Sequence, residues 1–387
     1  MVTLQTADNV LKDFYLDAIT REIDGKVSPF FSMIEKTSTN VVGKSVSKLV
    51  KTGIYSGIGA GSETGDLPIG DGGDVITLVA PLKNLYGTIE LSDKAIRASA
   101  NNEGAFVNLL NEEMQGLVKS AKYNFSRMLF GDGSGLLGSI ISAFGSDILY
   151  LDTVQGIEEG MYVDIYNDGE PYLSKVKIAE VNREDKYVRL HNASWTTGNA
   201  PTQQGKIYMH GAQTEYELTG LGALFSDMEI YNTDRSKAYM RPYIMEAYDL
   251  LNVNMIDNAI DAVEQRSGGR VNIMLCSWKV RRAILQCARD NNMTIGITTI
   301  GDNVQVPTYN GIPIVVDRFC PEHNLYLLNT DDFKICQLCD WQWMEGEDGK
   351  ILKQVPGKPV YTATLVKYAE LLCEKPCGQA VITDIDF

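Results

Sequence analysis

The longest regular pattern in the chain is an amphipathic stretch from residue 102 to residue 130. Its apolar side chains recur at steps of three and four residues, the spacing of one face of an α-helix: Phe106, Leu110, Met114, Leu117, Ala121, Phe125 and Met128. At 1.5 Å per residue this helix is about 43 Å long. Asn101 or Asn102 suits its N-cap, and Gly131 suits a left-handed C-cap. Any fold for this chain must therefore accommodate one very long helix.

A glycine-rich segment follows that helix. Gly133, Gly135 and Gly138 satisfy the GxGxxG spacing of dinucleotide-binding loops. That spacing binds a pyrophosphate only where it follows a strand and opens a helix, whereas here it follows a helix. We therefore predict that these glycines end the helix and turn the chain.

Two extended segments lie before the helix and flank a glycine-dense tip. The sequences VSKLVKTGIYSG and DVITLVAPLKNLYGTIELS are strand-like, and seven of the seventeen residues between 57 and 73 are glycine. Neither a buried core nor regular structure is expected in such a tip. The pattern predicts a projecting β-hairpin, and a lone hairpin is only marginally stable in water, so we expect a partner to support it.

The N-terminal segment differs in charge from the rest of the chain. Residues 7–23 have the 3.6-residue period of an amphipathic helix. Residues 1–52 carry seven basic and six acidic side chains, whereas the whole chain has a formal charge of −15. This asymmetry indicates an arm with its own partner.

The second half of the chain divides into an all-β segment and an α/β segment. Short alternating strands with Asn, Asp and Gly turns predict an inserted β module at 147–212. From about residue 236 we predict a helix at 242–265, a strand at 271–276, a helix at 277–291 and strands at 312–317 and 324–329. Residues 358–385 are mostly extended.

Motifs for catalysis or metal binding are missing or incomplete. GxSxG, HExxH and EF-hand loops are absent, and the three histidines are His191, His210 and His323. Residues 41–45, VVGKS, end like a Walker A motif but lack its first glycine and a following helix. We predict no catalytic residues, no cofactor and no metal, and hence no enzyme.

Four cysteines form a possible zinc set, because Cys336 and Cys339 are spaced CxxC and Cys373 and Cys377 are spaced CxxxC. FKICQLCDW has the pattern of a strand, in which residues three apart point to opposite faces. We therefore favour free thiols. Seven cysteines without a framework spacing indicate reduced thiols in a cytosol.

Charge and hydropathy argue against a general nucleic-acid-binding protein, a secreted protein and a membrane protein. A chain with 35 basic and 50 acidic residues has no general basic surface for nucleic acid, although it can contact DNA locally or enclose it. The N-terminus is charged throughout and lacks the apolar centre of a signal peptide. The longest uncharged apolar stretch, Gly133 to Ser146, is too short to span a bilayer, so we expect no membrane partner.

The order of elements, together with several local phrases, resembles the major capsid proteins of tailed bacteriophages of the Hong Kong 97 type. LKNLYGTIELSDKAIRAS (82–99) is similar to that family's return from its extended loop, and NEEMQGLVKSAKYNFSRMLFGDGSG (111–135) to its spine helix and glycine turn. NIMLCSWKVRRAI (272–284) and YNGIPIVVD (309–317) resemble its axial domain, and LVKYAELLCEKPCGQAVI (365–382) its closing strands.

The resemblance implies an α+β fold in six parts. These are an N-terminal arm (1–48), an extended loop (49–92), a peripheral domain with the spine helix (93–146), an inserted β-barrel-like domain (147–212), an axial domain (213–345) and C-terminal strands that return to the peripheral and axial domains (346–387).

The resemblance also implies a function, namely self-assembly into the pentamers and hexamers of an icosahedral shell around double-stranded DNA. The implied location is the virion capsid, assembled in the cytoplasm of a bacterial host. The implied partners are other copies of the chain, a portal and packaged DNA contacted non-specifically. Because only about 50 residues precede the loop, we expect a separate scaffolding protein and no large cleaved prosegment.

Three groups of residues are candidates for assembly or DNA contact. The loop-tip candidates are Gly57, Gly59, Gly61, Glu63 and Asp66. The candidates at the end of the spine helix are Gly131, Gly133 and Gly135. The candidates for facing DNA are Lys119, Lys122 and Arg127.

Two other functions remain open at this point. An encapsulin-like shell has a similar fold but encloses enzymes, and the long loop and β insert favour the phage capsid over it. An α/β enzyme with an unrecognised site in residues 236–345 belongs to a different class and predicts a small soluble species that responds to a ligand.

Overall fold

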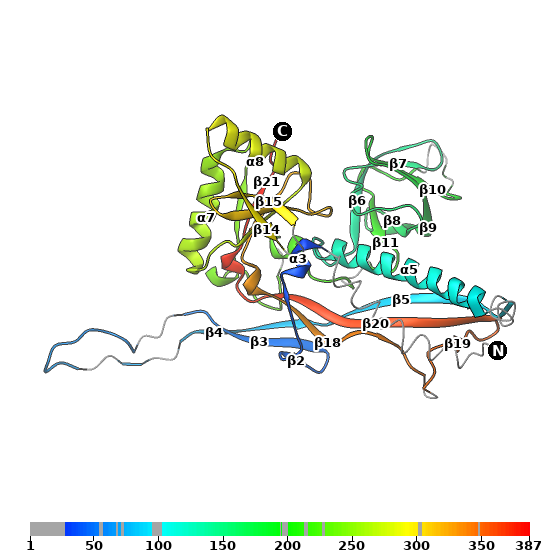
Figure 1. The fold of residues 1–387 in the computed structure, drawn as a ribbon, viewed down its shortest axis with the longest axis horizontal. Coiled ribbons are helices and arrows are strands. Elements are labelled where there is room, and N and C mark those ends of the chain that lie inside the picture. Colours follow the sequence, from blue (N-terminus) through cyan, green and yellow to red (C-terminus); the bar gives the residue numbers. More distant parts are fainter. Residues whose placement is uncertain are drawn as a thin grey trace.

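The computed structural model describes residues 28–53, 57–66, 69–70, 73–94, 103–193, 195, 200–212, 216–226, 229–300, 304–346 and 349–387, and for 103–112 the backbone alone. The predicted helix at 7–23 and the predicted caps Asn101 and Asn102 lie outside these residues. Within them the chain forms a long flat sheet, an α/β unit above one end of it, a β-barrel above the other end and a loop that projects sideways (Figure 1).

The long sheet, here called the peripheral sheet, lies beneath the longest helix. Its strands are β1 (Glu35–Thr37), β5 (Lys83–Ser92), β18 (Phe333–Trp343), β19 (Lys353–Gln354) and β20 (Val360–Cys373). β20 pairs antiparallel with both β5 and β18, whereas β1 joins β18 in parallel. Segments from three distant parts of the sequence therefore build one sheet.

The helix α5 (Glu103–Met128) lies along β5 and confirms the predicted long helix. It packs closely on that strand at Gly87, because a Cβ there would lie 2.7 Å from Cδ1 of Leu117. Met114, Val118 and Phe125 are buried in the same core.

The α/β unit contains a seven-stranded axial sheet. In spatial order its strands are β12 (Tyr243–Glu246), β21 (Ala380–Thr383), β17 (Leu325–Leu328), β13 (Ile273–Cys276), β16 (Ile312–Val316), β15 (Val304–Tyr309) and β14 (Gly296–Ile300). Two helices, α7 (Val253–Ser267) and α8 (Trp278–Asp290), share a core cluster with this sheet. Asn252 caps α7 by accepting a bond from Met255 N at 3.0 Å, and Ser277 caps α8 by accepting one from Val280 N at 3.2 Å.

The remaining strands form a closed barrel and a three-stranded ribbon. The barrel consists of β6 (Leu136–Phe144), β7 (Ile148–Leu151), β8 (Tyr162–Asn167), β9 (Glu170–Asn182), β10 (Tyr187–Leu190) and β11 (Lys206–Met209). The ribbon consists of β2 (Val41–Val42), β3 (Ser45–Lys51) and β4 (Val75–Pro81). The GKS sequence at 43–45 is thus the turn of a hairpin, as expected from its lack of a following helix.

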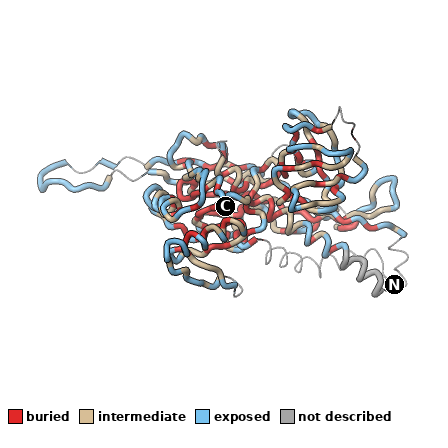
Figure 2. The backbone as a smooth tube through the Cα atoms, turned by 90° about the horizontal axis from the view of Figure 1, so that it is seen from above, coloured by how far each residue is buried: buried red, intermediate tan, exposed pale blue. Residues whose placement is uncertain are grey.

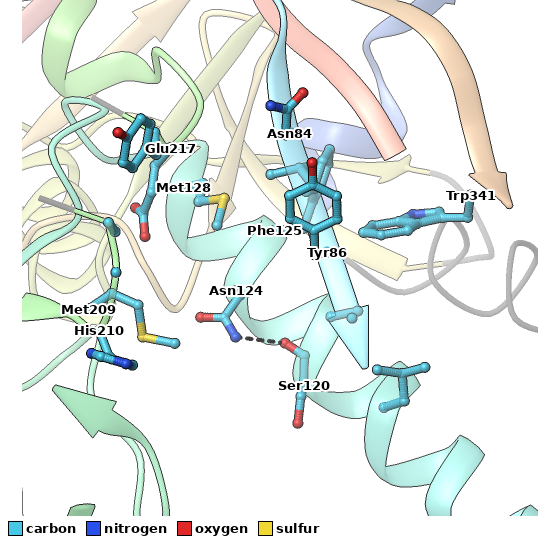
Figure 3. A pocket seen from close by; sticks show the side chains of 17 residues that line it. Asn84, Tyr86, Ser120, Asn124, Phe125, Met128, Met209, His210, Glu217 and Trp341 are labelled. Atoms are coloured by element: carbon cyan, nitrogen blue, oxygen red, sulfur yellow. Dashed lines mark hydrogen bonds between the residues drawn. The ribbon is translucent and has the colours of Figure 1, made fainter. Parts of the chain in front are cut away.

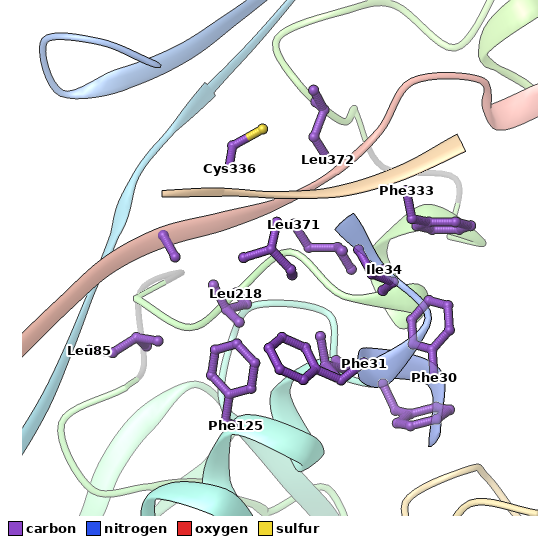
Figure 4. Packing of buried hydrophobic residues seen from close by; sticks show 14 of the residues in the cluster. Phe30, Phe31, Ile34, Leu85, Phe125, Leu218, Phe333, Cys336, Leu371 and Leu372 are labelled. Atoms are coloured by element: carbon purple, nitrogen blue, oxygen red, sulfur yellow. The ribbon is translucent and has the colours of Figure 1, made fainter. Parts of the chain in front are cut away.

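Short helices complete the fold: α3 (Pro29–Ser32), α6 (Leu221–Leu224), η2 (Ala238–Met240), η3 (Thr330–Asp332) and η4 (Pro376–Gly378). Among them α3 contributes most to the core. Phe30 packs edge-on against Phe333 with ring centroids 5.3 Å apart, and Phe31 packs against Phe125 at 4.9 Å (Figure 4). The arm therefore enters the core where the peripheral sheet, α5 and the axial unit meet.

Burial is concentrated at that meeting point. In the view from above, buried residues run through the middle of the molecule, whereas the described part of the loop tip is exposed (Figure 2). Among the described residues no helix is both long and apolar enough to cross a membrane.

The predicted helix at 242–265 is wrong over its first half. Tyr243–Glu246 form β12, which pairs in parallel with β21, and α7 begins only at Val253. The apolar spacing there fits a helix, but an unpaired edge of the axial sheet is available to this segment. Pairing with distant residues has therefore overridden the local pattern.

Several predicted boundaries also differ from the structure. The barrel begins at Leu136 instead of 147, because β6 pairs with β7 and β11. The arm predicted to end at 48 already contains the start of β3, and the loop predicted to end at 92 contains β5 of the peripheral sheet. β18, placed in the axial domain by sequence, also belongs to the peripheral sheet.

Candidate functional site

The first candidate surface is the extended loop formed by β3 and β4. One face of this ribbon is buried and consists of Val46, Ile76, Leu78 and Ala80. On the opposite face Leu49 is 63% exposed. Towards the tip, Ile58 and Ile69 are each 86% exposed. Large apolar side chains gathered on one projecting element are typical of a surface that another molecule covers.

The predicted tip residues all lie within the described part of this loop. Gly57 is half-buried, and the other four are exposed: Gly59, Gly61, Glu63 and Asp66. The tip therefore combines two carboxylates with nearby exposed isoleucines.

The base of the loop is firmly attached to the protomer. Lys48 forms an ion pair with Glu374 at 3.1 Å, and Val79 N donates to Tyr231 O at 3.0 Å. The Tyr231 hydroxyl donates to Leu371 O and accepts from Cys373 N, so the segment that holds β4 is itself bonded to β20. The loop thus has a fixed base and an exposed end.

The second candidate is the end of the spine helix α5. Gly133 and Gly135 have φ values of +92° and +75°, a region that favours glycine, and β6 begins at Leu136. The predicted turn is confirmed. Gly131 is not left-handed, so the predicted left-handed C-cap at Gly131 is wrong: the reversal takes place at the two later glycines.

A second glycine segment crosses this helix end. A Cβ at Gly220 would overlap the carbonyl oxygen of Met128 and would lie 2.6 Å from that of Leu129. Leu221 N donates to Leu129 O at 2.8 Å. The chain leaving the barrel is thereby bonded directly to the end of α5.

Arg127 is buried and does not face DNA, which corrects the sequence prediction. Its guanidinium pairs with Glu217 of the crossing segment, and the two side chains are only 7% and 4% exposed. Arg127 lies five residues after Lys122, about 140° further round the helix. That rotation turns it from the outer surface towards the residues that leave the barrel.

The same region buries a second carboxyl group, that of Glu370 on β20. Its oxygens accept bonds from Thr219 N at 2.8 Å and from Leu371 N at 2.9 Å. Complete burial raises the pKa of Glu370 to about 7 in spite of these bonds. We refer to Arg127, Glu217, Thr219, Lys367 and Glu370 as the junction.

Lys367 is the second buried cation of the junction, after Arg127. It is fully buried on β20, and its Nζ lies 2.6 Å from Oδ1 of Asp340 and 5.7 Å from the ring centres of Phe125 and Trp341. Burial alone would raise the pKa of Asp340, but the charge and hydrogen bond of Lys367, together with the Trp341 N–H and the Lys36 charge, lower that pKa. A charge pair therefore joins β18 to β20 beneath α5.

The barrel is fixed to both neighbouring parts of the protomer. Gln155 Nε2 donates to Cys320 O at 2.9 Å, and Lys186 pairs with Glu322 at 3.4 Å, both across to the axial unit. Glu158 pairs with Arg318, whose guanidinium lies 5.3 Å from the centre of the Tyr123 ring on α5. The barrel, α5 and the axial unit thus enclose a groove of about 1120 Å³.

The two remaining DNA candidates line this groove. Lys119 is exposed and Lys122 is half-buried. Glu158, Glu159 and Asp317 also line it, so the groove carries charges of both signs. The structure therefore brings Lys119 and Lys122 together and separates Arg127 from them.

A smaller pocket of about 230 Å³ lies between β5, α5 and the end of the barrel (Figure 3). His210 lies on one side, and its Nδ1 is 2.9 Å from Oδ1 of Asp164. Burial alone would raise the pKa of Asp164, but hydrogen bonds from Lys175 N, His210 and Ser174 lower it. On the facing helix Asn124 Nδ2 donates to Ser120 O at 3.1 Å. Asp164 and His210 therefore hold neighbouring backbone segments of the barrel together, and this pair has a structural role.

The chemistry available to the cysteines is limited. All seven are free thiols, and six of them are buried. Burial raises the pKa of Cys336 to about 11 and that of Cys373 well above its ordinary value, which disfavours the reactive thiolate. Within the described ranges no group of three or more His, Cys, Asp or Glu side chains is close enough to hold a metal ion.

Sequence analysis missed Glu217 and Glu370, although one signal was present. LVKYAELLC, the C-terminal part of β20, places Lys367 and Glu370 inside an apolar strand, and charged residues in that position require partners. Glu217 carried no local signal, because it is 90 residues from Arg127.

The fold and this site can now be compared with known proteins. The model of the SU10 major capsid protein family matches residues 205–350. The capsid asymmetric unit of cyanophage A-1(L) matches with a TM-score of 0.54 and 11% identity, over 93% of this chain and 92% of that one. The holo-SrpI encapsulin of Synechococcus elongatus PCC 7942 matches with a TM-score of 0.50 and 10% identity, over 94% and 89%. No curated protein sequence matches the chain.

The architecture has the Hong Kong 97-type fold of phage capsid proteins. The family match adds that residues 205–350 are similar to the SU10 major capsid protein family, and the whole fold is similar to that of a phage capsid protein.

Proposed function

We propose that this chain forms the pentamers and hexamers of an icosahedral phage shell, and that its extended loop joins neighbouring copies. The supporting observation is the contrast within that loop. Its base is tied to β20 through Tyr231 and to Glu374, the residue after that strand, whereas Leu49, Ile58 and Ile69 remain exposed. A second copy would cover those side chains and supply the support that a two-stranded ribbon lacks.

The direct test is assembly of the full-length protein. The chain is expressed with and without its neighbouring scaffold gene, sedimented, and the fast fraction imaged by negative stain. Closed shells or capsomer rings are the expected result. A uniform small species under every condition would contradict the proposal and favour the α/β enzyme considered from sequence.

An encapsulin-like shell is the second candidate, because an encapsulin has a comparable fold. The match of residues 205–350 to a major capsid protein family supports the phage function over it. Gene neighbours separate the two: terminase and portal genes are expected beside this gene, and a cargo-enzyme gene there would overturn the assignment.

The remaining partners follow from the same proposal. They are a separate scaffolding protein, a portal and packaged double-stranded DNA, with assembly in the host cytoplasm. Lys119 and Lys122 are proposed as local DNA contacts, since one is exposed and both line the groove beside α5. Reversing both charges is expected to reduce genome packaging, and unchanged packaging would count against them.

We also propose structural roles for the tip and the helix end, and no catalytic role for the chain. Gly57, Gly59, Gly61, Glu63 and Asp66 would adapt the loop to a neighbouring copy. Gly133 and Gly135 would set the direction in which the barrel leaves α5, with Gly131 preceding them. The raised thiol pKa values support the absence of a cysteine nucleophile.

A further inference from the structure

The groove between the barrel, α5 and the axial unit has several apolar side chains on its walls. Trp278, the first residue of α8, lines it and is 48% exposed, and Tyr162, the first residue of β8, lines it and is 44% exposed. Met161, Val316 and Phe319 are half-buried along the same walls. Two large aromatic side chains that stay exposed in a groove of about 1120 Å³ are typical of a surface that a further segment covers.

The described part of the chain begins on the wall of this groove. Pro29 lines the groove, and the residue before it, Ser28, is buried. The Ser28 hydroxyl donates to the carboxylate of Asp317, a buried residue of the groove wall, and accepts a bond from Phe30 N at 3.2 Å. The chain that precedes Ser28 is therefore attached at a fixed point beside the groove.

Twenty-seven residues precede Ser28, and they include the amphipathic period of residues 7–23. The apolar positions of that period are Val10, Leu11, Phe14, Tyr15, Ala18 and Ile19. Five steps of extended chain separate residue 23 from Ser28, and they span at most about 18 Å. The sequence therefore keeps the end of this apolar period within reach of the groove.

We propose that residues 7–23 form a helix that lies in the groove of its own protomer, with its apolar face against Trp278, Tyr162 and Phe319. An isolated helix of this length is marginal in water, and burial of its apolar face supplies the missing stability. A short tether gives the segment a local concentration in the millimolar range, so a modest contact is enough to keep it bound. In this position the arm braces the barrel against the axial unit.

The dimensions of the groove suit this occupant. Its lining on α5 runs from Gly116 to Ser126, about 15 Å along the helix axis, and a helix of residues 7–23 is about 26 Å long. The two lysines proposed as DNA contacts lie on the α5 side, whereas the surface proposed for the arm lies on the side of α8 and the barrel. The inference concerns a single protomer, so it does not depend on the proposed shell function. The partner expected for the arm from its charge is then the chain itself.

The test is hydrogen exchange of the full-length chain at several low protein concentrations, measured by mass spectrometry on peptides from residues 7–23. A synthetic peptide of residues 1–27 gives the exchange rates of the free segment. Trp278→Ser removes the aromatic ring of α8 from the groove, and Phe14→Ser changes the apolar face of the arm. The controls are Ile244→Ser, 41% exposed on the axial unit but outside the groove, and Asp13→Ser, on the opposite face of residues 7–23.

The amides of residues 7–23 are expected to exchange about 100-fold more slowly in the wild type than in the free peptide, at every concentration. Each test variant should speed their exchange about tenfold, the effect of truncating one aromatic anchor in a buried contact. Each control should stay within about twofold of the wild type. Peptides from β20 in the core should keep their wild-type exchange, which shows that the protomer remains folded. If they do not in Trp278→Ser, Tyr162→Ser on the barrel wall tests the same groove.

Four results would overturn the inference. Exchange of residues 7–23 at the rate of the free peptide would show that the segment is not bound. Faster exchange in Phe14→Ser but not in the groove variants would place the arm elsewhere on the protein. Equal acceleration in the controls would show that the groove has no special role. Protection that falls on dilution would show that the arm binds a second copy instead of its own protomer.

Discussion

In the extended loop the large apolar side chains are exposed, whereas at the junction beneath α5 the charged side chains are buried. Ile58 and Ile69 of the loop are each 86% exposed. Lys367 and Glu370 of the junction are completely buried, and each has a polar partner within 3 Å. The two regions thus reverse the usual distribution of polar and apolar residues.

The difference lies in where the partners are found. The charged side chains of the junction have their partners within one protomer, because Arg127 meets Glu217, Lys367 meets Asp340, and Glu370 accepts bonds from Thr219 and its own strand. The loop has no comparable cover among the described residues of its own protomer. Changes at the junction should therefore alter folding, and changes at the loop should alter assembly.

Breaking the buried ion pair should have the largest effect on folding. Glu217→Ala leaves the Arg127 guanidinium buried without its carboxylate, and we expect the free energy of unfolding to fall by about 3–5 kcal/mol. Urea unfolding of the full-length chain measures this. Glu159→Ala, at an exposed position, is the control and should change stability by less than about 0.5 kcal/mol. Equal effects at both positions would show that the buried pair has no special role.

The second largest effect should appear as a dependence on pH. The pKa of Glu370 is raised from its ordinary value of 4.5 to about 7 in the folded state. Between these two pH values the folded chain therefore binds more protons than the unfolded chain. The stability contributed by this group is fully present at low pH and is lost as the pH rises through about 7.

We therefore expect the stability of the wild type, relative to Glu370→Gln, to fall by up to about 3 kcal/mol between about pH 5 and about pH 8. Thermal unfolding of both proteins across this range gives the difference. Glu90→Gln, an exposed change on β5, should leave the wild-type profile intact. A constant difference between wild type and Glu370→Gln would contradict this account of the junction.

Substitutions at two glycines compare a crowded backbone position beside the end of α5 with an open position within the helix. At Gly220 an added methyl group meets the carbonyl oxygens of Met128 and Leu129, whereas at Gly116 in α5 nothing lies within 4 Å. Gly220→Ala should cost about 1–3 kcal/mol through steric overlap. Gly116→Ala should stabilise the chain by about 0.5–1 kcal/mol, because it favours the helix. Denaturant unfolding should show a lower free energy of unfolding for Gly220→Ala and a higher one for Gly116→Ala. Changes of the same sign in both variants would contradict this prediction.

The smallest effect on folding should come from the loop. Replacing Ile58 and Ile69 by Ser removes two exposed apolar side chains and should change the stability of the unassembled protomer by less than about 0.5 kcal/mol. Urea unfolding at low protein concentration measures this change in the free energy of unfolding. A loss of several kcal/mol would mean that the loop packs against its own protomer.

Local patterns allowed much of this fold to be predicted. The spacing of apolar residues gave the helix α5, and glycine density gave the exposed tip between β3 and β4. The glycines after α5 were correctly interpreted as a turn because they follow a helix. These features depend on neighbouring residues alone.

What could not be predicted depends on residues far apart in sequence. Arg127 resembled a surface residue because Glu217, its partner, is 90 positions away. Tyr243–Glu246 have a helical pattern but form a strand, since β21 from the C-terminal end pairs with them.

The most direct test of the central claim compares assembly of the wild type with that of Ile58→Ser/Ile69→Ser by sedimentation velocity at matched concentrations, with Phe144→Ser, an exposed apolar change on the barrel, as control. We predict fast-sedimenting shells for the wild type and the control, and folded but unassembled protein for the double variant. Shells formed equally well by all three proteins would contradict the claim that the extended loop joins neighbouring copies.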